Sequence, residues 1–202
     1  MAAKLAFTTG TLGALAILLL TVLGGAAFPN YSHLSQFISE LGAREAPHGK
    51  LVSFAGFLPA GVLLCAFAFF ASRALPRSPV TLLGLMGVAF FALGYGVAAF
   101  LPCEQACRPV EPSLSQAIHN LVGATGYFSG GVGLILLGTQ ARSWPEARHL
   151  WVLGVSGGVL SLVSLLFLSP AFPFVGLVQR VIETCMLLWI VACGVYLRRM
   201  AR

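Results

Sequence analysis

Stretches without charged side chains divide the chain into six apolar segments. Crossing a hydrocarbon layer of ~30 Å takes about 20 apolar helical residues, and each segment is about that long. Alternation of apolar and polar residues with a period of two is absent, and lipid leaves the backbone of an open strand without hydrogen-bond partners. We therefore predict membrane-spanning helices at residues 5–28, 51–72, 80–101, 118–139, 150–168 and 178–197.

The composition excludes most classes of soluble protein. Hydrophobic residues make up 58% of the 202 residues and charged residues only 9%, whereas a soluble domain carries about 25% charged residues. A soluble enzyme, a nucleic-acid-binding protein and a disordered chain are excluded. The predicted fold class is an all-α polytopic membrane protein, a six-helix bundle that forms one transmembrane domain over residues 1–202. The first span has an alternative, a signal peptide cleaved near Gly24–Ala27, but its apolar stretch exceeds the usual length of about 7–15 residues.

The distribution of basic residues predicts the orientation of the bundle. An even number of spans places both termini on one side, and most of the 12 lysines and arginines lie on that side. Because cytoplasmic loops are enriched in Lys and Arg, we predict a protein of the bacterial cytoplasmic (inner) membrane with both termini in the cytoplasm. Its basic C-terminus is expected to contact anionic membrane lipids and not nucleic acid. The basic residues of this side are Lys4, Arg73, Arg77, Arg142, Arg148, Arg198, Arg199 and Arg202.

The cysteines fall into two groups. Cys103 and Cys107 lie close together in the short outer loop that precedes the fourth span. Outside the cytoplasm such a pair is expected to form a disulfide, and the alternative is a metal-binding pair with His119. The cysteines inside the spans are predicted to be apolar packing residues. These are Cys65, Cys185 and Cys193.

The outer segment Tyr31–Gly42 has helical periodicity. Its apolar residues are spaced i, i+3, i+4 and i+7, its polar residues occupy the opposite face, and Gly42 can end a helix. The pattern predicts a short amphipathic helix in the outer interface. Two interpretations stay open, a cover that only seals the bundle and a lid that gates access to a site. The apolar residues are Leu34, Phe37, Ile38 and Leu41, and the polar residues are Ser32, Ser35, Gln36 and Ser39.

One stripe of the fourth span carries a histidine and three glycines. His119, Gly123, Gly126 and Gly130 are separated by four, three and four residues, so they share one helical face. Small residues mark the face where transmembrane helices approach each other, and Gly126 and Gly130 form a GxxxG pair. His119 is therefore predicted to face the bundle interior near its outer end. A lone histidine there is more often a hydrogen-bonded structural residue than a catalyst.

The sixth span is unusual because it contains ionisable residues. Gln179, Arg180 and Glu183 lie in its first turns, and the i, i+3 spacing of Arg180 and Glu183 allows an ion pair within the helix. The alternative partner of Arg180 is a phosphate of the ligand. Ionisable groups inside a membrane face a bundle interior or a watery cavity. Arg180 is long enough to reach the headgroup layer by itself. Glu183 lies one turn deeper and is the strongest single indication of function.

Together these residues predict one polar cavity that faces outward. The predicted function is to bind or handle a lipid or lipid-linked ligand. One alternative is an intramembrane hydrolase or acyltransferase that uses His119 with Glu183 or Glu40. Another is a non-catalytic subunit that packs in a larger membrane complex, or a homo-oligomer, through glycine-rich helix faces. The candidate catalytic residues are His119, Glu183 and Glu40. The candidate ligand-binding residues are Ser35, Ser39, Glu40, His48, His119, Asn120, Gln179, Arg180 and Glu183.

Other kinds of chemistry find less support in the residues. The chain contains no aspartate, which excludes a Ser-His-Asp triad, although glutamate can replace aspartate in such a set. Zinc binding by His33, His48, His119 and a glutamate is conceivable, but no H-E-x-x-H spacing accompanies them. A haem between His48 and His119 has weaker support, because both lie at helix ends. We predict no metal and no cofactor.

Four short motifs resemble those of an uncharacterised bacterial membrane family, the domain of unknown function 998. They are Ile38–Ala43, Pro102–Cys107, His119–Gly123 and Gly176–Arg180. The resemblance extends over essentially the whole chain. It implies no catalytic residue, because that family has no established reaction.

A more distant likeness joins the chain to the six-span damage-regulated autophagy modulator (DRAM) group. It rests on Ile38 and Ser39 with Gly42, and on the small residues of the His119 helix. Wider relatives of that group are linked to the remodelling of lipid anchors and to phospholipid distribution. The resemblance thus implies a lipid-related role on the non-cytoplasmic face, although Glu40 and Gly42 depart from the aspartate and threonine-glycine arrangement of the group.

Overall fold

The structure is a computed structural model that describes residues 1–201, with the exception of the Gln105 side chain. Over this range it is all-helical, and six helices are long and apolar enough to cross a membrane. Five are single helices, and the second is a continuous run of three segments. The helices are α1 (Ala2–Ala27), α2 (Gly49–Leu51) with η2 (Val52–Phe57) and α3 (Leu58–Ala74), α4 (Pro79–Phe100), α5 (Leu114–Ala141), α6 (Arg148–Leu165) and α7 (Val175–Met200).

The predicted fold class is confirmed, and the helix ends differ from the predicted ones by about one turn or less. The largest difference is at the start of α5, where the helix begins at Leu114. The hydroxyl of Ser113 accepts a hydrogen bond from the backbone N–H of Gln116, so the first turn is capped four residues before the apolar run begins.

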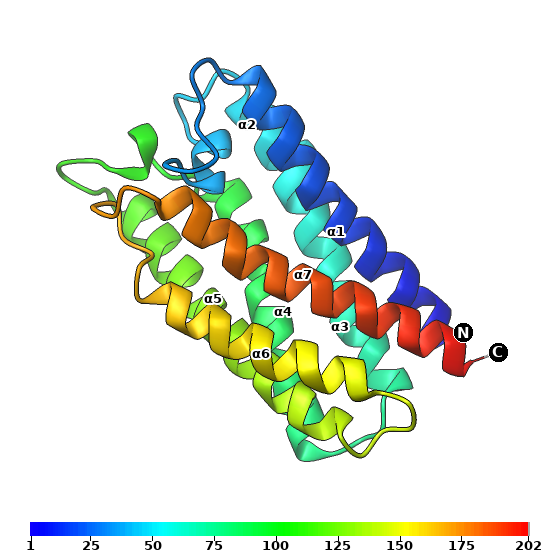
Figure 1. Cartoon of the computed structure of the whole chain (residues 1–202). Coiled ribbons are helices and arrows are strands. Elements are labelled where there is room, and N and C mark those ends of the chain that lie inside the picture. Colours follow the sequence, from blue (N-terminus) through cyan, green and yellow to red (C-terminus); the bar gives the residue numbers. More distant parts are fainter. Residues whose placement is uncertain (202) are drawn as a thin grey trace.

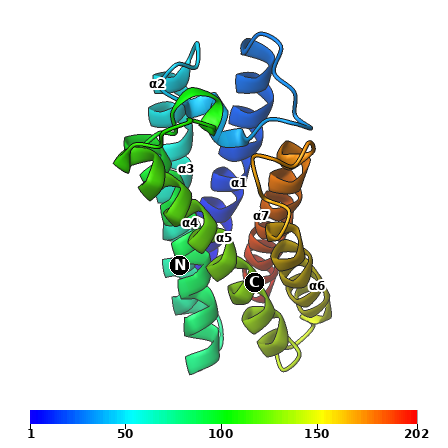
Figure 2. The ribbon, with the colours of Figure 1, turned by 90° about the vertical axis from the view of Figure 1, so that its left-hand side faces the viewer.

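The six helices form a closed ring in which each packs against its neighbours in the chain (Figures 1 and 2). Helix α1 closes the ring between α3 and α7. One face of α7 supplies much of the core, and the indole of the buried Trp189 donates to the carbonyl of Leu150 at 3.1 Å. Because Pro59 lacks an N–H, the helix cannot make the ordinary bond at that position, and the wider π-helical turn η2 precedes it.

Glycines bring the backbones of α4, α5 and α6 into contact. A Cβ on Gly133 would lie 2.6 Å from the carbonyl oxygen of Gly84, and one on Gly154 would lie 2.6 Å from Cα of Gly138. The GxxxG glycine Gly130 faces Met186 of α7. These glycine faces are therefore occupied by packing within the bundle.

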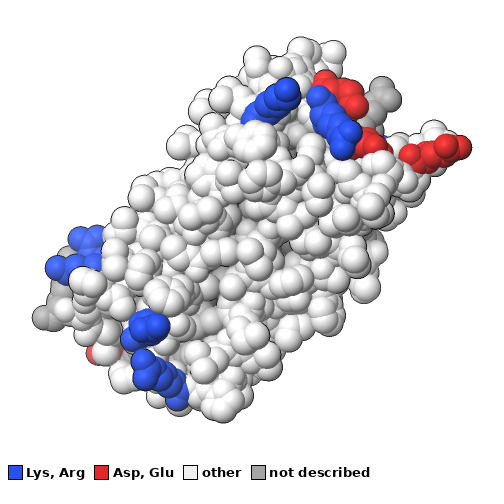
Figure 3. Space-filling model, turned by 180° about the vertical axis from the view of Figure 1, so that it is seen from behind, with Lys and Arg blue, Asp and Glu red and all other residues white. Residues whose placement is uncertain are grey.

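Charged residues gather at the two ends of the molecule and leave a broad uncharged belt between them (Figure 3). Both termini lie at one end, here named the terminal end (Figure 1). The opposite end, named the loop end, carries the segments 28–48, 101–113 and 166–174. Large apolar side chains, such as Leu18 and Met86, are exposed along the belt. This distribution is that of a multi-pass membrane protein, and Arg202 of the predicted lipid-contacting C-terminus lies outside the described residues.

Of the short amphipathic helix predicted over Tyr31–Gly42, only the last five residues are helical. The segment forms turns followed by the 3-10 helix η1 (Ile38–Gly42), whose apolar residues Ile38 and Leu41 are buried in the bundle. Side chains bond nearby backbone donors before η1: Gln36 accepts from the N–H of Ser32 at 2.7 Å, and Glu40 accepts from the N–H of Phe37 at 2.9 Å. Such local competition is the usual reason that polar side chains favour turns over helices.

Candidate functional site

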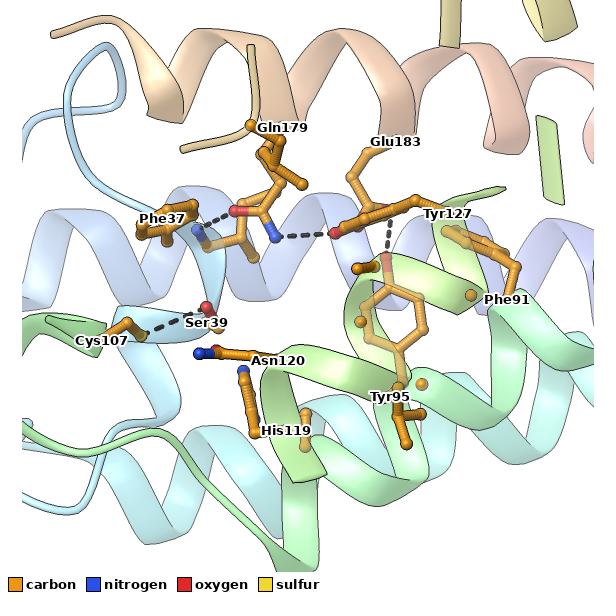
Figure 4. A pocket seen from close by; sticks show the side chains of 18 of the residues that line it. Phe37, Ser39, Phe91, Tyr95, Cys107, His119, Asn120, Tyr127, Gln179 and Glu183 are labelled. Atoms are coloured by element: carbon orange, nitrogen blue, oxygen red, sulfur yellow. Dashed lines mark hydrogen bonds between the residues drawn. The ribbon is translucent and has the colours of Figure 1, made fainter. Parts of the chain in front are cut away.

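A pocket of about 280 Å³ lies at the loop end between α4, α5 and α7 (Figure 4). The 3-10 helix η1 forms its roof, and two residues of the loop after α6 form one edge. Most of its wall is apolar or aromatic. The polar residues of the wall are Ser39, Tyr95, His119, Asn120, Tyr127, Gln179 and Glu183.

The carboxylate of Glu183 is the polar centre of the pocket. The side chain is 4% exposed and lies about 12 Å along α7 from its first residue. The hydroxyl of Tyr95 donates to one carboxylate oxygen, and the hydroxyl of Tyr127 donates to the other at 2.6 Å. Both oxygens of this buried acid therefore have a neutral hydrogen-bond donor.

A backbone N–H fixes the direction of this network. The N–H of Ile38 in η1 can only donate, and it donates to Oε1 of Gln179 at 2.7 Å. The amide of Gln179 is thereby oriented with Nε2 toward Tyr127, and Nε2 donates to the Tyr127 hydroxyl at 2.7 Å. The hydroxyl hydrogen of Tyr127 is then free to point at Glu183. The roof of the pocket and its buried acid thus belong to one hydrogen-bonded chain.

Helical spacing explains why these side chains meet. Gln179 and Glu183 are one turn apart on α7, and Phe91 and Tyr95 are one turn apart on α4, so each pair shares a face. The rings of Phe91 and Tyr95 meet edge to face with centroids 5.6 Å apart, and Phe91 also lies 6.0 Å from the ring of Tyr127. The pocket is therefore lined by one turn of α7 and by longer stretches of α4 and α5, which run from Phe91 to Ala98 and from His119 to Tyr127.

His119 and Asn120 form the rim of the pocket on α5. The carbonyl of Leu101 can only accept, so the Nδ1 atom of His119, 2.9 Å away, carries the hydrogen. This tautomer leaves Nε2 of a neutral His119 as an acceptor. The side-chain oxygen of Asn120 accepts a hydrogen bond from Gln116 at 2.8 Å, so the side-chain nitrogen of Asn120 carries the two amide hydrogens.

The predicted disulfide between Cys103 and Cys107 is confirmed. It closes a turn in which Ala106 and Cys107 have positive φ. The hydroxyl of Ser39 lies 3.3 Å from the sulfur of Cys107 and is the only possible donor of that pair, because a disulfide sulfur carries no hydrogen. The turn therefore packs on η1 and completes the roof.

In the same loop, hydrogen bonds from Ser113 lower the pKa of Glu104 below its ordinary value.

The predicted ion pair between Arg180 and Glu183 is wrong. The guanidinium of Arg180 turns toward the loop end, where it donates to the hydroxyl of Tyr31 and to Nδ1 of His33, each at 2.8 Å. It also donates to the backbone carbonyls of Gln36 and Gly176. Burial raises the pKa of the Tyr31 hydroxyl, and the charge of Arg180 offsets part of that rise. Burial also lowers the pKa of His33, and the charge of Arg180 lowers it further. Arg180 thus fastens the outer segment to α7.

The structure brings five of the predicted ligand-binding residues to the pocket and leaves the others outside it. Ser39, His119, Asn120, Gln179 and Glu183 line the pocket. The four that do not line it are Ser35, Glu40, His48 and Arg180. Glu40 is buried and accepts a hydrogen bond from the N–H of Phe37 at the start of η1, His48 is exposed before α2, and Ser35 offers its carbonyl to Arg108.

The catalytic and metal alternatives are not assembled in the described part of the chain. Ser39 contacts the disulfide, His119 bonds a backbone carbonyl and Glu183 bonds two tyrosines, so the three do not bond one another. Within residues 1–201, no group of three or more His, Cys, Asp or Glu side chains is close enough to hold a metal ion.

Sequence reasoning missed Tyr95 and Tyr127. Both lie in apolar spans, where a tyrosine resembles any other aromatic packing residue. The available signal was the hydroxyl itself, because a buried tyrosine hydroxyl needs a hydrogen-bond partner, and Glu183 is the predicted intramembrane acceptor.

The fold and the pocket define a polytopic, all-helical membrane protein with six spans. The chain matches the family described as "Protein of unknown function (DUF998)" over residues 11–196, and it belongs to that family. No curated protein and no solved structure matches it. The resemblance to this family is thus confirmed, whereas the distant likeness to the DRAM group stays a prediction.

Proposed function

We propose that this protein binds an amphiphilic molecule, a lipid or a lipid-linked compound, in the pocket at the loop end. The observation that carries the proposal is a buried carboxylate, Glu183, at the polar centre of an otherwise largely apolar pocket. Ligand sites typically combine an apolar wall with a few convergent polar groups. A volume of about 280 Å³ suits a headgroup or the first part of a chain, and it is too small for a whole membrane lipid.

The short helix α6 supports access from the membrane. Helix α5 has 28 residues and α6 has 18, so α6 is about 15 Å shorter. Leu168 and Pro170, in the loop that follows α6, line the pocket where a longer helix would run between α5 and α7. Apolar side chains exposed nearby include Phe128 and Phe167. A molecule in the membrane would therefore approach the pocket over an apolar surface.

We place the loop end on the non-cytoplasmic side of a bacterial cytoplasmic membrane. The basic residues at the terminal end support this orientation through the positive-inside bias. The disulfide at the loop end supports it as well, because disulfides persist outside the reducing cytoplasm.

The test is to identify lipids that co-purify with the protein and to fill the pocket. Gly123 lines the pocket, and a Cβ placed there meets no atom within 4 Å, so Gly123→Leu occupies the pocket without displacing the backbone. The matched control is Gly96→Leu on α4, where a Cβ also meets no atom within 4 Å but which lies outside the pocket wall. Mass spectrometry of the purified proteins should show one enriched amphiphile with the wild type and Gly96→Leu, and none with Gly123→Leu. An equal lipid profile for all three would refute the proposal.

A further inference from the structure

The pocket contains an acid without a basic partner. Of the described residues that line it, Glu183 is the only carboxylate and none is a lysine or arginine. The nearest arginine in sequence, Arg180, is held by Tyr31, His33 and two backbone carbonyls on the other side of the roof. The charge of Glu183 is therefore not compensated by a basic group of the pocket.

The hydrogen bonds to Glu183 suit its ionised form. Each carboxylate oxygen receives a tyrosine hydroxyl, and the Ile38–Gln179–Tyr127 chain orients one of them toward the acid. Hydrogen bonds to the charged form favour it. A buried carboxylate is nevertheless costly without an opposite charge. A positive charge supplied by a ligand would offset this cost and stabilise the ionised form of Glu183.

Aromatic rings surround the same acid. The ring of Phe91 packs against those of both Tyr95 and Tyr127, and Phe57 lies 6.0 Å from the ring of Tyr95. The face of an aromatic ring attracts a cation within about 6 Å, and such rings recognise ammonium groups in many ligand sites. At the rim, Nε2 of His119 adds an acceptor. A carboxylate, several ring faces and an acceptor together favour a positively charged hydrogen-bond donor over a phosphate.

We infer that the pocket takes the protonated amine of an amphiphile, with Glu183 as its counter-ion and the rings of Phe91, Tyr95 and Tyr127 around it. This inference rests on the proposed function, because it requires that the pocket admits an amphiphile. The amine has two possible sources, an aminophospholipid and a simple alkylammonium compound, and both present the same group to Glu183.

Native mass spectrometry of the detergent-solubilised protein with added probes tests the inference. The probes are phosphatidylethanolamine, its N-acetylated form, phosphatidylglycerol, dodecylammonium and the uncharged monoolein. The N-acetylated lipid keeps the phosphate and the acyl chains of the parent, loses the positive charge and gains one acetyl group, so we expect it to bind about 10-fold more weakly or worse, from the usual strength of a charged hydrogen bond. Phosphatidylglycerol should also bind about 10-fold more weakly than the amine lipid. Dodecylammonium binding with no phosphatidylethanolamine binding would assign the simple amine as the source.

Variants separate this inference from the proposed function. Glu183→Gln should remove the preference for amines over the uncharged monoolein, whereas Glu146→Gln, an exposed acid at the terminal end, should leave the binding of every probe unchanged. Gly123→Leu should abolish binding of all probes. A second outcome is that Gly123→Leu abolishes binding while the wild type binds the N-acetylated and anionic lipids as tightly as the amine lipid. In that case the pocket binds amphiphiles, and the amine inference is wrong. If Gly123→Leu has no effect on any probe, the proposed function also fails. The wild-type comparison of the two ethanolamine lipids stands even if Glu183→Gln does not fold.

Discussion

Gln179 links η1, the roof of the pocket, to Tyr127 and through it to Glu183. Its replacement by methionine should weaken the attachment of η1 to α7. Methionine keeps the length of the side chain but removes the acceptor for Ile38 and the donor to Tyr127. The N–H of Ile38 then stays buried without a partner, which costs about 1–3 kcal/mol. Tyr127 still bonds Glu183, so most of the loss falls on η1.

Amide hydrogen exchange of the segment 37–42 measures this loss directly. A local cost of about 1–3 kcal/mol corresponds to exchange about 5- to 150-fold faster in Gln179→Met than in the wild type. The control is Gln140→Met, which removes one acceptor for Ser78 at the terminal end. Ser78 keeps Thr81 as a partner, so that variant should not alter the roof. Unchanged exchange at 37–42 in Gln179→Met would refute the link between η1 and α7.

Three further predictions concern the loop end and the helix contacts. Cys103→Ser removes a disulfide that closes a very short loop, and it should lower the free energy of unfolding by about 2 kcal/mol, measured by thermal unfolding in detergent with and without reductant. For His33 the folded pKa lies below the usual 6.5, so the unfolded chain binds the proton more tightly. The contact with Arg180 should therefore lose stability as the pH falls below about 6.5. An imidazole NMR titration that shows an unshifted or raised pKa would contradict this. Gly154→Ala places a Cβ 2.6 Å from backbone and should cost about 1–3 kcal/mol, whereas Gly96→Ala meets nothing and should be tolerated in the same unfolding assay.

The spans and the central acid were predictable because membranes restrict sequence strongly. Charged residues bound most of the apolar stretches, so the approximate helix positions follow from their spacing and from the length needed to cross a membrane. Glu183 stood out because an ionisable residue inside a span is costly and needs a local reason. The disulfide followed in the same way from the spacing of Cys103 and Cys107 and from the side of the membrane assigned to their loop.

The contacts of single side chains were not predictable at the same level. The i, i+3 spacing of Arg180 and Glu183 allowed an ion pair, but the guanidinium found four acceptors at the loop end. The periodicity of residues 31–42 indicated an α-helix, but Gln36 and Glu40 bond the local backbone instead. The first choice depends on partners more than a hundred residues away and the second on competing local hydrogen bonds, and a periodic pattern reveals neither.

The glycine contacts among α4, α5 and α6 have a mechanical consequence. Where two backbones touch, neither helix can slide or tilt without a collision, so the side of the pocket built by α4 and α5 behaves as a fixed wall. If the pocket binds the proposed ligand, adaptation to a bulkier one would fall on the parts of the wall outside these glycine contacts, which are η1 with its disulfide turn and the segment 166–174. A related chain that keeps these glycines but differs in the two segments would accept a ligand of a different size with the same packing of α4, α5 and α6.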